Sequence, residues 1–205
     1  MNKINYQKEL DRIIERNERE GVVPRLLLHV CCAPCSSYCL EYLSDYFDIT
    51  VYYYNPNITV REEYEYRLSE EERYISLRDF RHPVSMIPAA YDTKEFFDAV
   101  KGLEREPEGG LRCEKCFRLR LQATAEKAKE LGFDCFTTTL TISPLKNAAL
   151  LNEIGFEVGE RCGAAWLPSD FKKREGYKRS IELSREYDLY RQNYCGCVFS
   201  RTQKS

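Results

Sequence analysis

The stretch Arg25-Leu-Leu-Leu-His-Val-Cys-Cys-Ala-Pro-Cys35 carries the pattern that decides the fold. Its first six residues form a short, almost uninterrupted apolar run, which is typical of a strand buried on both faces of a parallel sheet. Three cysteines follow within five residues. Pro34 suits the first turn of a helix, because its missing N–H would have no partner there anyway. The stretch therefore predicts a buried strand, a cysteine-bearing turn and the N-terminus of a helix.

Strands and helices are predicted to alternate along the rest of the chain. Besides Arg25–Val30, the expected strands are Asp48–Tyr54, Val84–Ile87, Cys135–Thr139 and a last short one over Phe156–Val158. The expected helices are Tyr6–Arg19, Ser36–Tyr46, Val60–Arg81, Thr93–Val100, Cys113–Leu131, Lys146–Ile154 (ended by Gly155) and Arg174–Tyr187. This alternation predicts an α/β fold with a doubly wound parallel sheet, in which the loops after the strands gather at the ligand-binding edge.

Length and composition predict a single globular domain over residues 1–205. Within it, residues 1–22 read as an N-terminal helical extension, and residues 174–205 as a C-terminal helix with a cysteine-bearing tail. No run approaches the roughly 18 apolar residues of a membrane span, so we expect no membrane association. Residues 1–20 are charged throughout and do not resemble a secretory signal, which favours the reducing cytoplasm. With a net charge of −2, contact with nucleic acid would need a local basic patch.

Ten cysteines are unusual for such a chain, and clustered thiols in a reducing compartment indicate metal binding or redox catalysis. They fall into three groups, at residues 31–35, 113–116 and 195–197. The first two groups open predicted helices, where the helix dipole and basic neighbours favour thiolates. Cys195-Gly-Cys197 can close a strained, easily reduced disulfide or supply two metal ligands. Single cysteines at 39, 135 and 162 are expected to be core or incidental residues.

Thiolate ligands of this kind suit zinc or an iron–sulfur cluster. The 77 residues between Cys35 and Cys113 do not match the spacer of a zinc ribbon. The additional C-x-C pair, with its redox chemistry, favours iron–sulfur. The two histidines lie far apart in the sequence, and His29, inside the apolar strand, is expected to be a satisfied core residue.

A basic stretch near the C-terminus is a candidate RNA-binding segment. Five cations within eight residues, with an aromatic ring among them, suit a phosphate backbone and a stacked base, although a solvated helix face is the commoner meaning of a charge run. Asp170 precedes the stretch and is a candidate metal ligand or general acid, and Tyr190 is a second candidate for stacking on a base. The predicted RNA-binding residues are Lys172, Lys173, Arg174, Tyr177, Lys178 and Arg179.

Several separate motifs together resemble one known family. They are Cys31-Cys-Ala-Pro-Cys35, Arg112-Cys-x-x-Cys-Phe-x-x-Arg-Leu121, Ser143-Pro144, Asp170-Phe-Lys-Lys173, Gly176-Tyr177 and Tyr190-Arg-Gln-x-Tyr-Cys-Gly-Cys197. Between Leu26 and Cys197 the chain is similar to the cobalamin-independent epoxyqueuosine reductases of the QueH type. The resemblance implies an adenine-nucleotide-hydrolase-like fold, here with extra helices. It also implies reduction of the epoxide of epoxyqueuosine at the wobble position of tRNA, the last step of queuosine biosynthesis.

The resemblance also implies a cofactor and roles for named residues. Cys31, Cys32, Cys113 and Cys116 would bind a [4Fe–4S] cluster, and Cys195 with Cys197 would form a redox-active pair. No cobalamin is expected. The residues themselves add a hypothesis: a second, mononuclear iron near Cys35 and Asp170 could polarise the epoxide oxygen, and Asp170 is counted among the candidate catalytic residues. The partners would be the anticodon loop of a tRNA carrying epoxyqueuosine and an electron donor.

Two other readings of the same residues remain. Cys32-Ala-Pro-Cys35 after a strand also fits a thioredoxin-like thiol–disulfide oxidoreductase, for which Ile87-Pro88 would supply a cis-proline loop. That reading leaves the other clustered cysteines unexplained. A zinc-stabilised RNA-binding module would explain the thiols and the basic stretch, but not the C-x-C pair.

Overall fold

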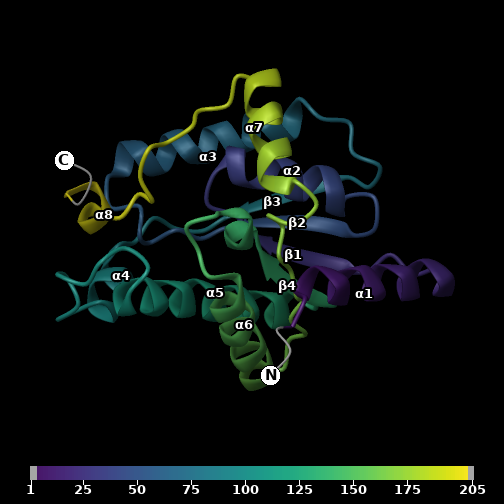
Figure 1. The fold of residues 1–205 in the computed structure, drawn as a ribbon, viewed down its shortest axis with the longest axis horizontal. Helices are drawn as coiled ribbons and strands as arrows, with labels where there is room; N and C mark the ends of the chain where they lie inside the picture. Colours follow the sequence, from purple (N-terminus) through teal and green to yellow (C-terminus); the bar gives the residue numbers. More distant parts are fainter. Residues whose placement is uncertain (1–3, 203–205) are drawn as a thin grey trace.

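The computed structural model describes residues 4–202, which form a four-stranded, all-parallel sheet with helices on both faces (Figure 1). The strand order is β3-β2-β1-β4, so β1 is central and the chain crosses from one edge to the other between β3 and β4. This confirms the expected doubly wound α/β fold. The strands are β1 (Arg25–His29), β2 (Asp48–Tyr53), β3 (Val84–Pro88) and β4 (Cys135–Thr138).

The helices connect and cover these strands. In Figure 1, α2, α3 and α7 lie above the sheet, whereas α5 and α6 lie below it. The helices are α1 (Tyr6–Glu20), α2 (Ala33–Leu43), α3 (Arg61–Ser76), α4 (Lys94–Ala99), α5 (Leu111–Leu131), the short 3₁₀ helix η1 (Thr139–Ile142), α6 (Ala148–Cys162), α7 (Gly176–Glu186) and α8 (Val198–Thr202).

The central strand β1 is buried on both faces, as its apolar run predicts. Leu26 and Leu28 belong to one core cluster, which also contains Leu10 of α1 and Leu40 of α2. Leu27 points to the opposite face and packs in a second cluster with residues of α5 and α6. The period of two along a strand thus divides one run of leucines between two cores.

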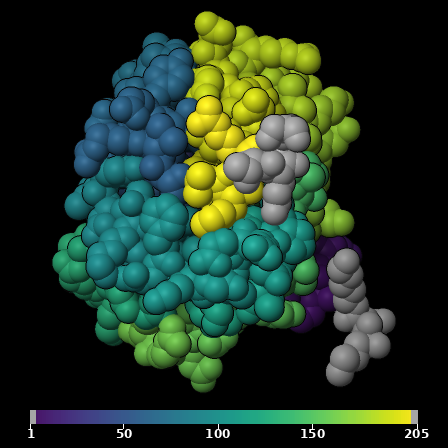
Figure 2. All heavy atoms as spheres, turned by 90° about the vertical axis from the view of Figure 1, so that its left-hand side faces the viewer, coloured from purple at the N-terminus to yellow at the C-terminus, as the bar shows by residue number. Residues whose placement is uncertain are grey.

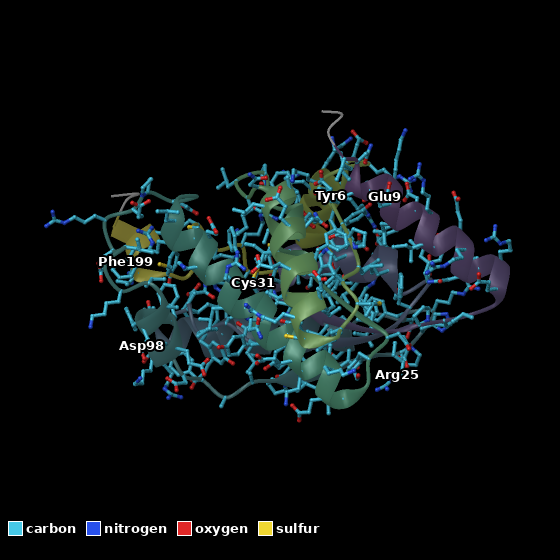
Figure 3. The ribbon with its side chains drawn as sticks, turned by 90° about the horizontal axis from the view of Figure 1, so that it is seen from below. Tyr6, Glu9, Arg25, Cys31, Asp98 and Phe199 are labelled. Atoms are coloured by element: carbon cyan, nitrogen blue, oxygen red, sulfur yellow. The ribbon has the colours of Figure 1, made fainter. Side chains whose placement is uncertain are left out.

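The topology of the sheet determines at which end of the strands a ligand site can form. β1 pairs with β2 on one side and with β4 on the other, so the chain leaves β1 and β4 toward different faces. Such a reversal opens a crevice at the carboxyl ends of the strands. The cysteine-bearing turn follows β1 there, and the segment Thr139–Lys146 follows β4. Figure 3 shows Cys31 in the interior, while Arg25, which begins β1, lies near one end of the molecule and Phe199 near the other.

The expected strand over Phe156–Val158 is wrong, because α6 continues through it to Cys162. Gly155 does not end this helix but is buried within it, and its missing side chain makes room for Trp166. The contact that extends the sheet beyond β4 comes later, as an isolated parallel bridge between Phe136 and Trp166. The sequence pattern misled because a helical glycine that packs against an aromatic ring looks like a helix terminator.

Several helix boundaries also differ from expectation. The last long helix begins at Gly176 rather than Arg174, because Arg174 and Glu175 have the left-handed backbone conformation (φ 53° and 59°). α3 ends at Ser76 rather than near Arg81, and α6 begins at Ala148, after Asn147 caps it. α2 and α5 begin at Ala33 and Leu111, two or three residues earlier than predicted. These shifts place the first two cysteine groups in or beside first helical turns.

Across residues 4–202 there is no helix both long and apolar enough to span a membrane.

Gly155 provides a test of this packing. A Cβ at this position would lie 2.3 Å from the Trp166 ring, so Gly155→Ala forces the ring or the helix to move. We expect the free energy of unfolding to fall by about 1–3 kcal/mol, as in other overpacked cores. Urea denaturation measures the loss. Glu153→Ala, on the exposed side of the same helix, should change stability by less than about 0.5 kcal/mol. Equal stability of Gly155→Ala and the native chain would contradict the packing described.

Candidate functional site

The first thiol group lies where β1 meets α2. The sulfur atoms of Cys31, Cys32 and Cys35 all lie within 4.8 Å of one another, close enough to share a metal ion. Cys32 occupies the N-cap position of α2 and Pro34 the first turn. Hydrogen bonding from the Cys32 thiol, 3.8 Å away, lowers the pKa of Cys31, whereas the same contact raises the pKa of Cys32 to about 12. Of the three thiols, Cys31 is therefore the one that loses its proton most readily.

The second thiol group joins two segments that lie about eighty residues apart in the sequence. Cys113 and Cys116, in the first turns of α5, line a small cavity together with Cys195 and Cys197 of the C-terminal tail. Cys116 and Cys197 are buried, and burial raises the pKa of Cys116 to about 12. All ten cysteines carry free thiols in this structure, so Cys195 and Cys197 are not joined by a disulfide here.

Buried arginines lie beside both thiol groups. Arg120 interacts electrostatically with Cys116, Cys195 and Cys31, and thus connects the two groups. It is fully buried, with one hydrogen bond to Asn55 (3.2 Å), and its Nε and Nη2 have no hydrogen-bond partner.

Arg112 lines the second cavity, and its Nε and Nη2 also lack partners. Buried guanidinium groups with unpaired donors are costly unless an anion faces them. The donor set therefore fits an anionic metal–thiolate centre between the two groups.

The C-terminal tail is held over these thiols by buried contacts. Arg67, which is 1% exposed, donates hydrogen bonds to the backbone carbonyls of Tyr194 and Cys195 (both 3.3 Å). Gln192 donates from Nε2 to the Cys32 sulfur at 2.8 Å, which links the tail to the first group. Figure 2 shows the tail, in yellow, packed between the α3 region in blue and the segment around residues 95–115 in teal.

A second cavity, of about 280 Å³, opens beside the first thiol group. Cys35 and Cys195 lie on its wall, together with Lys146, which follows β4 and η1. Lys146 interacts electrostatically with Cys195, Cys31 and Cys35, and these thiols raise its pKa. Tyr177, 37% exposed, lines the same cavity. The volume of this cavity is close to the lower limit for small-molecule sites. Cys195 is the one cysteine that lines both this cavity and the four-cysteine cavity.

The structure separates the predicted RNA-binding cations into paired and unpaired ones. Arg179 forms two hydrogen bonds of 2.9 Å with Glu41 and packs α7 against α2. Arg174 pairs with Asp11 at 2.6 Å, and Lys178 with Glu175 at 3.5 Å. Lys173 is exposed. Exposed ion pairs such as those of Arg174 and Lys178 contribute little to stability, so little free energy is lost when such a cation binds a phosphate instead.

Asp170 does not belong to the group of cysteines that could share an ion. Its carboxylate lies 2.9 Å from the Lys172 ammonium, and it is absent from the residues that line either cavity. Lys172 also donates to the Thr141 carbonyl at 3.3 Å, which ties this pair to the segment after β4. Among the described residues, the only group close enough to share one ion is Cys31, Cys32 and Cys35, so the structure does not bring Asp170 to Cys35.

The histidine and the three single cysteines that were expected to be structural are buried in the core or packed against it. His29 is fully buried, and its ring nitrogens contact Thr138 (2.8 Å) and the Tyr54 carbonyl (3.1 Å). Burial lowers its pKa to about 3, so the ring is neutral. Cys39 and Cys135 pack in the core, and Cys162 packs against it. The loop at Ile87-Pro88 contains no cis bond, because no cis peptide bond occurs in residues 4–202. This removes one element of the thioredoxin-like alternative.

Sequence reasoning missed Lys146, Arg67 and Gln192. Lys146 follows Ser143-Pro144 at the predicted start of a helix, and nothing local marks its charge as turned inward. Arg67 lies in a helix with many charged residues, where one buried arginine has no distinct pattern. Gln192 belongs to the C-terminal motif and could have been singled out only from that motif.

Comparison with known proteins gives a consistent result. The model of the family "Epoxyqueuosine reductase QueH" matches residues 26–203. A protein of that name from Streptococcus pyogenes is 48% identical over 200 residues, which cover 97% of this chain and 78% of the relative. One from Staphylococcus epidermidis is also 48% identical, over 97% of this chain and 85% of its own. The Thermotoga maritima relative is 35% identical over 87% of this chain and 91% of its own.

Arg120 provides a test of the charge balance at the thiols. Arg120→Met removes the buried cation that interacts with both thiol groups, so a negatively charged metal–thiolate centre becomes less stable beside them. We expect anaerobic reconstitution with iron and sulfide to load clearly less iron per chain than in the native protein. Arg120→Lys should restore part of the loading. Arg118→Met, on the same helix but paired with Glu157 at the surface, is the matched control and should load normally. Normal loading of Arg120→Met would contradict the role given to Arg120.

Proposed function

The chain belongs to the family of QueH epoxyqueuosine reductases, and we propose a division of work among its thiols, its cavity and its cations for the reaction of that family. The reaction reduces the epoxide of epoxyqueuosine to queuosine at the wobble position of tRNA, the last step of queuosine biosynthesis. One observation supports the proposal most strongly. Cys195 lines both the 280 Å³ cavity and the cavity of four cysteines, so a nucleoside and the redox-active thiols share one wall.

The chemistry sets what the site must supply. Converting an epoxide to an alkene takes two electrons and two protons, and the oxygen leaves as water. Over a complete catalytic cycle the electrons must come from a donor outside the chain, which also restores any protein thiols oxidised on the way. The protons must come from acids near the oxygen. A tRNA substrate also makes the cytoplasm the expected location.

We assign the cofactor to the thiols at the two helix N-termini. Cys31, Cys32, Cys113 and Cys116 would hold a [4Fe–4S] cluster, which supplies electrons one at a time when bound. Arg120 interacts electrostatically with thiols of both groups, which supports a shared centre. The unpaired donors of Arg112 and Arg120 would face its negative charge. Cys35 remains the candidate for a second, mononuclear iron, with Asp170 reaching it only after rearrangement.

The tail would contribute the second redox element. Cys195 and Cys197 flank Gly196, whose φ of +102° is readily adopted by glycine, and a Cβ there would lie 2.8 Å from Ile58. The bend places both thiols in the four-cysteine cavity. Oxidation of the pair to a disulfide releases two electrons and two protons, which equals the demand of one epoxide.

The cavity would bind and orient the modified nucleoside. Tyr177 offers an exposed ring on which a base can stack. Lys146, one of two cations that line the cavity with Arg191, would face the epoxide oxygen, where an ammonium group can donate a hydrogen bond or a proton as charge develops. Lys172, Lys173, Arg174, Lys178 and Arg179 would contact phosphates of the anticodon loop.

The first test concerns the cluster. Cys113→Ala removes one assigned ligand, so anaerobically reconstituted protein should lose its visible cluster absorbance and its turnover together. Cys162→Ala is the matched control, since this thiol packs against the core away from both cavities, and it should keep both properties. Full turnover by iron-free Cys113→Ala protein would refute the assignment.

The second test concerns Lys146. Lys146→Gln keeps a polar side chain of similar length but removes the charge, and we expect kcat to fall by about 10²- to 10³-fold, as when a donor to a developing oxyanion is lost. Lys146→Arg should retain part of the rate. Turnover is compared per iron bound in each variant, which separates the effect from loss of the cofactor. An unchanged kcat in Lys146→Gln would exclude this role.

A further inference from the structure

A groove beside the proposed nucleoside cavity has no part in the chemistry proposed for the thiols and Lys146. It has a volume of about 940 Å³ and lies between the start of α3 and the C-terminal tail. Tyr66, Tyr190 and Tyr194 lie on its wall, with Glu62 and Arg201. Asn193 and Tyr194 also line the nucleoside cavity, so the two hollows adjoin.

From this arrangement we infer that the groove binds a nucleobase next to the target nucleotide in the same RNA strand, stacked on Tyr66. The inference rests on the proposed function, because it takes the 280 Å³ cavity as the place of the modified nucleoside. Residues 193–194 line both the cavity and the groove. A strand that leaves the target nucleotide over these residues therefore reaches the aromatic wall of the groove. Bases in single-stranded loops are commonly bound by stacking on such rings.

Tyr66 has the exposure that stacking needs. Its side chain is 50% exposed, although tyrosine is an amphipathic residue that usually covers more of its ring. The edge-to-face contact with Tyr190, with ring centroids 4.6 Å apart and planes at 61°, fixes its orientation. A base that stacks on a ring already held in place costs little further ordering.

Tyr190 supports Tyr66 from a rigid position. Its hydroxyl donates to Glu63 (3.2 Å), and its backbone N–H donates to Glu70 (3.0 Å). Glu63 pairs with buried Arg67 at 2.6 Å, and Arg67 holds the carbonyl of Cys195. The groove and the catalytic tail therefore depend on the same buried arginine, so they keep a fixed relation to each other.

The charges along the groove suit a base better than a run of phosphates. The carboxylate of Glu62 can accept a hydrogen bond from the amino or ring N–H of a base, but it repels a phosphate. The guanidinium of Arg201 lies 5.9 Å from the Tyr194 ring and is exposed, so it can contact the one phosphate that links two nucleotides. This pattern favours one stacked base with its linking phosphate.

The test is a binding cycle with the full chain and an RNA stem-loop that carries epoxyqueuosine. Affinity is measured by fluorescence anisotropy for the intact loop and for loops with an abasic residue on the 5′ or the 3′ side of the target. Tyr66→Ala should bind the intact loop about 5- to 100-fold more weakly, the range expected for one lost stacking contact. One of the two abasic loops should weaken binding to the native chain similarly, and Tyr66→Ala should then cause no further loss.

Two variants serve as controls. Tyr66→Phe keeps the ring and should bind like the native chain. Phe156→Ala removes an aromatic side chain of nearly equal exposure (49%) from α6 on the other side of the sheet, and should also bind normally.

Three results would overturn the inference. Native affinity of Tyr66→Ala for the intact loop would do so. Additivity would also do so, that is, a Tyr66→Ala substitution that weakens binding to both abasic loops as much as it weakens binding to the intact loop. A Tyr66→Ala protein whose RNA affinity is unchanged, but whose turnover falls only with a protein electron donor and not with a chemical reductant, would assign the groove to that donor. If the native chain reduces the intact loop while the cycle is additive, the proposed function stands and only the groove is misassigned. If the native chain leaves the epoxide intact, the proposed function itself fails.

Discussion

The site depends on how one buried arginine holds the C-terminal tail. Arg67 extends from α3, is neutralised by Glu63, and donates to the carbonyls of Tyr194 and Cys195. Other contacts act with this anchor, because Gln192 donates to the Cys32 sulfur and the Gly196 carbonyl accepts from the Thr59 N–H. With these contacts, thiols far apart in the sequence meet at helix N-termini, and the four-cysteine cavity closes. A buried charge of this kind is costly unless fully paired, so the tail itself becomes part of the partner that Arg67 requires.

Two hollows meet at Cys195. On one side lies the cavity with Lys146 and Tyr177, which we propose binds the nucleoside. On the other lies the smaller, mainly apolar cavity lined by four cysteines, Phe96 and Arg112. Because Cys195 lines both, the proposed redox chemistry would take place close to the substrate. The buried guanidinium groups of Arg112 and Arg120 would then balance negative charge at the thiols.

The sequence predicted the elements that depend on local pattern. The leucine run of β1, the Pro34 turn and the helix of Cys113 are all set by neighbours in sequence, and each occurs, although both helices begin two or three residues earlier than predicted. The failures come from contacts between distant residues. Gly155 resembles a helix end because nothing nearby shows that Trp166 will pack on it. The inward direction of Lys146 depends on distant thiols, and that of Arg67 on the distant carbonyls of Tyr194 and Cys195. The grouping of cysteines into 31–35 and 113–116 with 195–197 is likewise a property of the topology rather than of any single motif.

The central claim is that this chain, with iron bound at its thiols, reduces an epoxide on a nucleoside in RNA. The most direct measurement is a single-turnover reaction under anaerobic conditions, with reconstituted protein, a chemical reductant and an RNA stem-loop carrying epoxyqueuosine, followed by mass spectrometry of the nucleoside. Our account predicts that the nucleoside loses one oxygen atom at a rate that follows the iron and sulfide content of the preparation. An unchanged nucleoside with fully loaded protein, or equal conversion by protein free of iron, would contradict it.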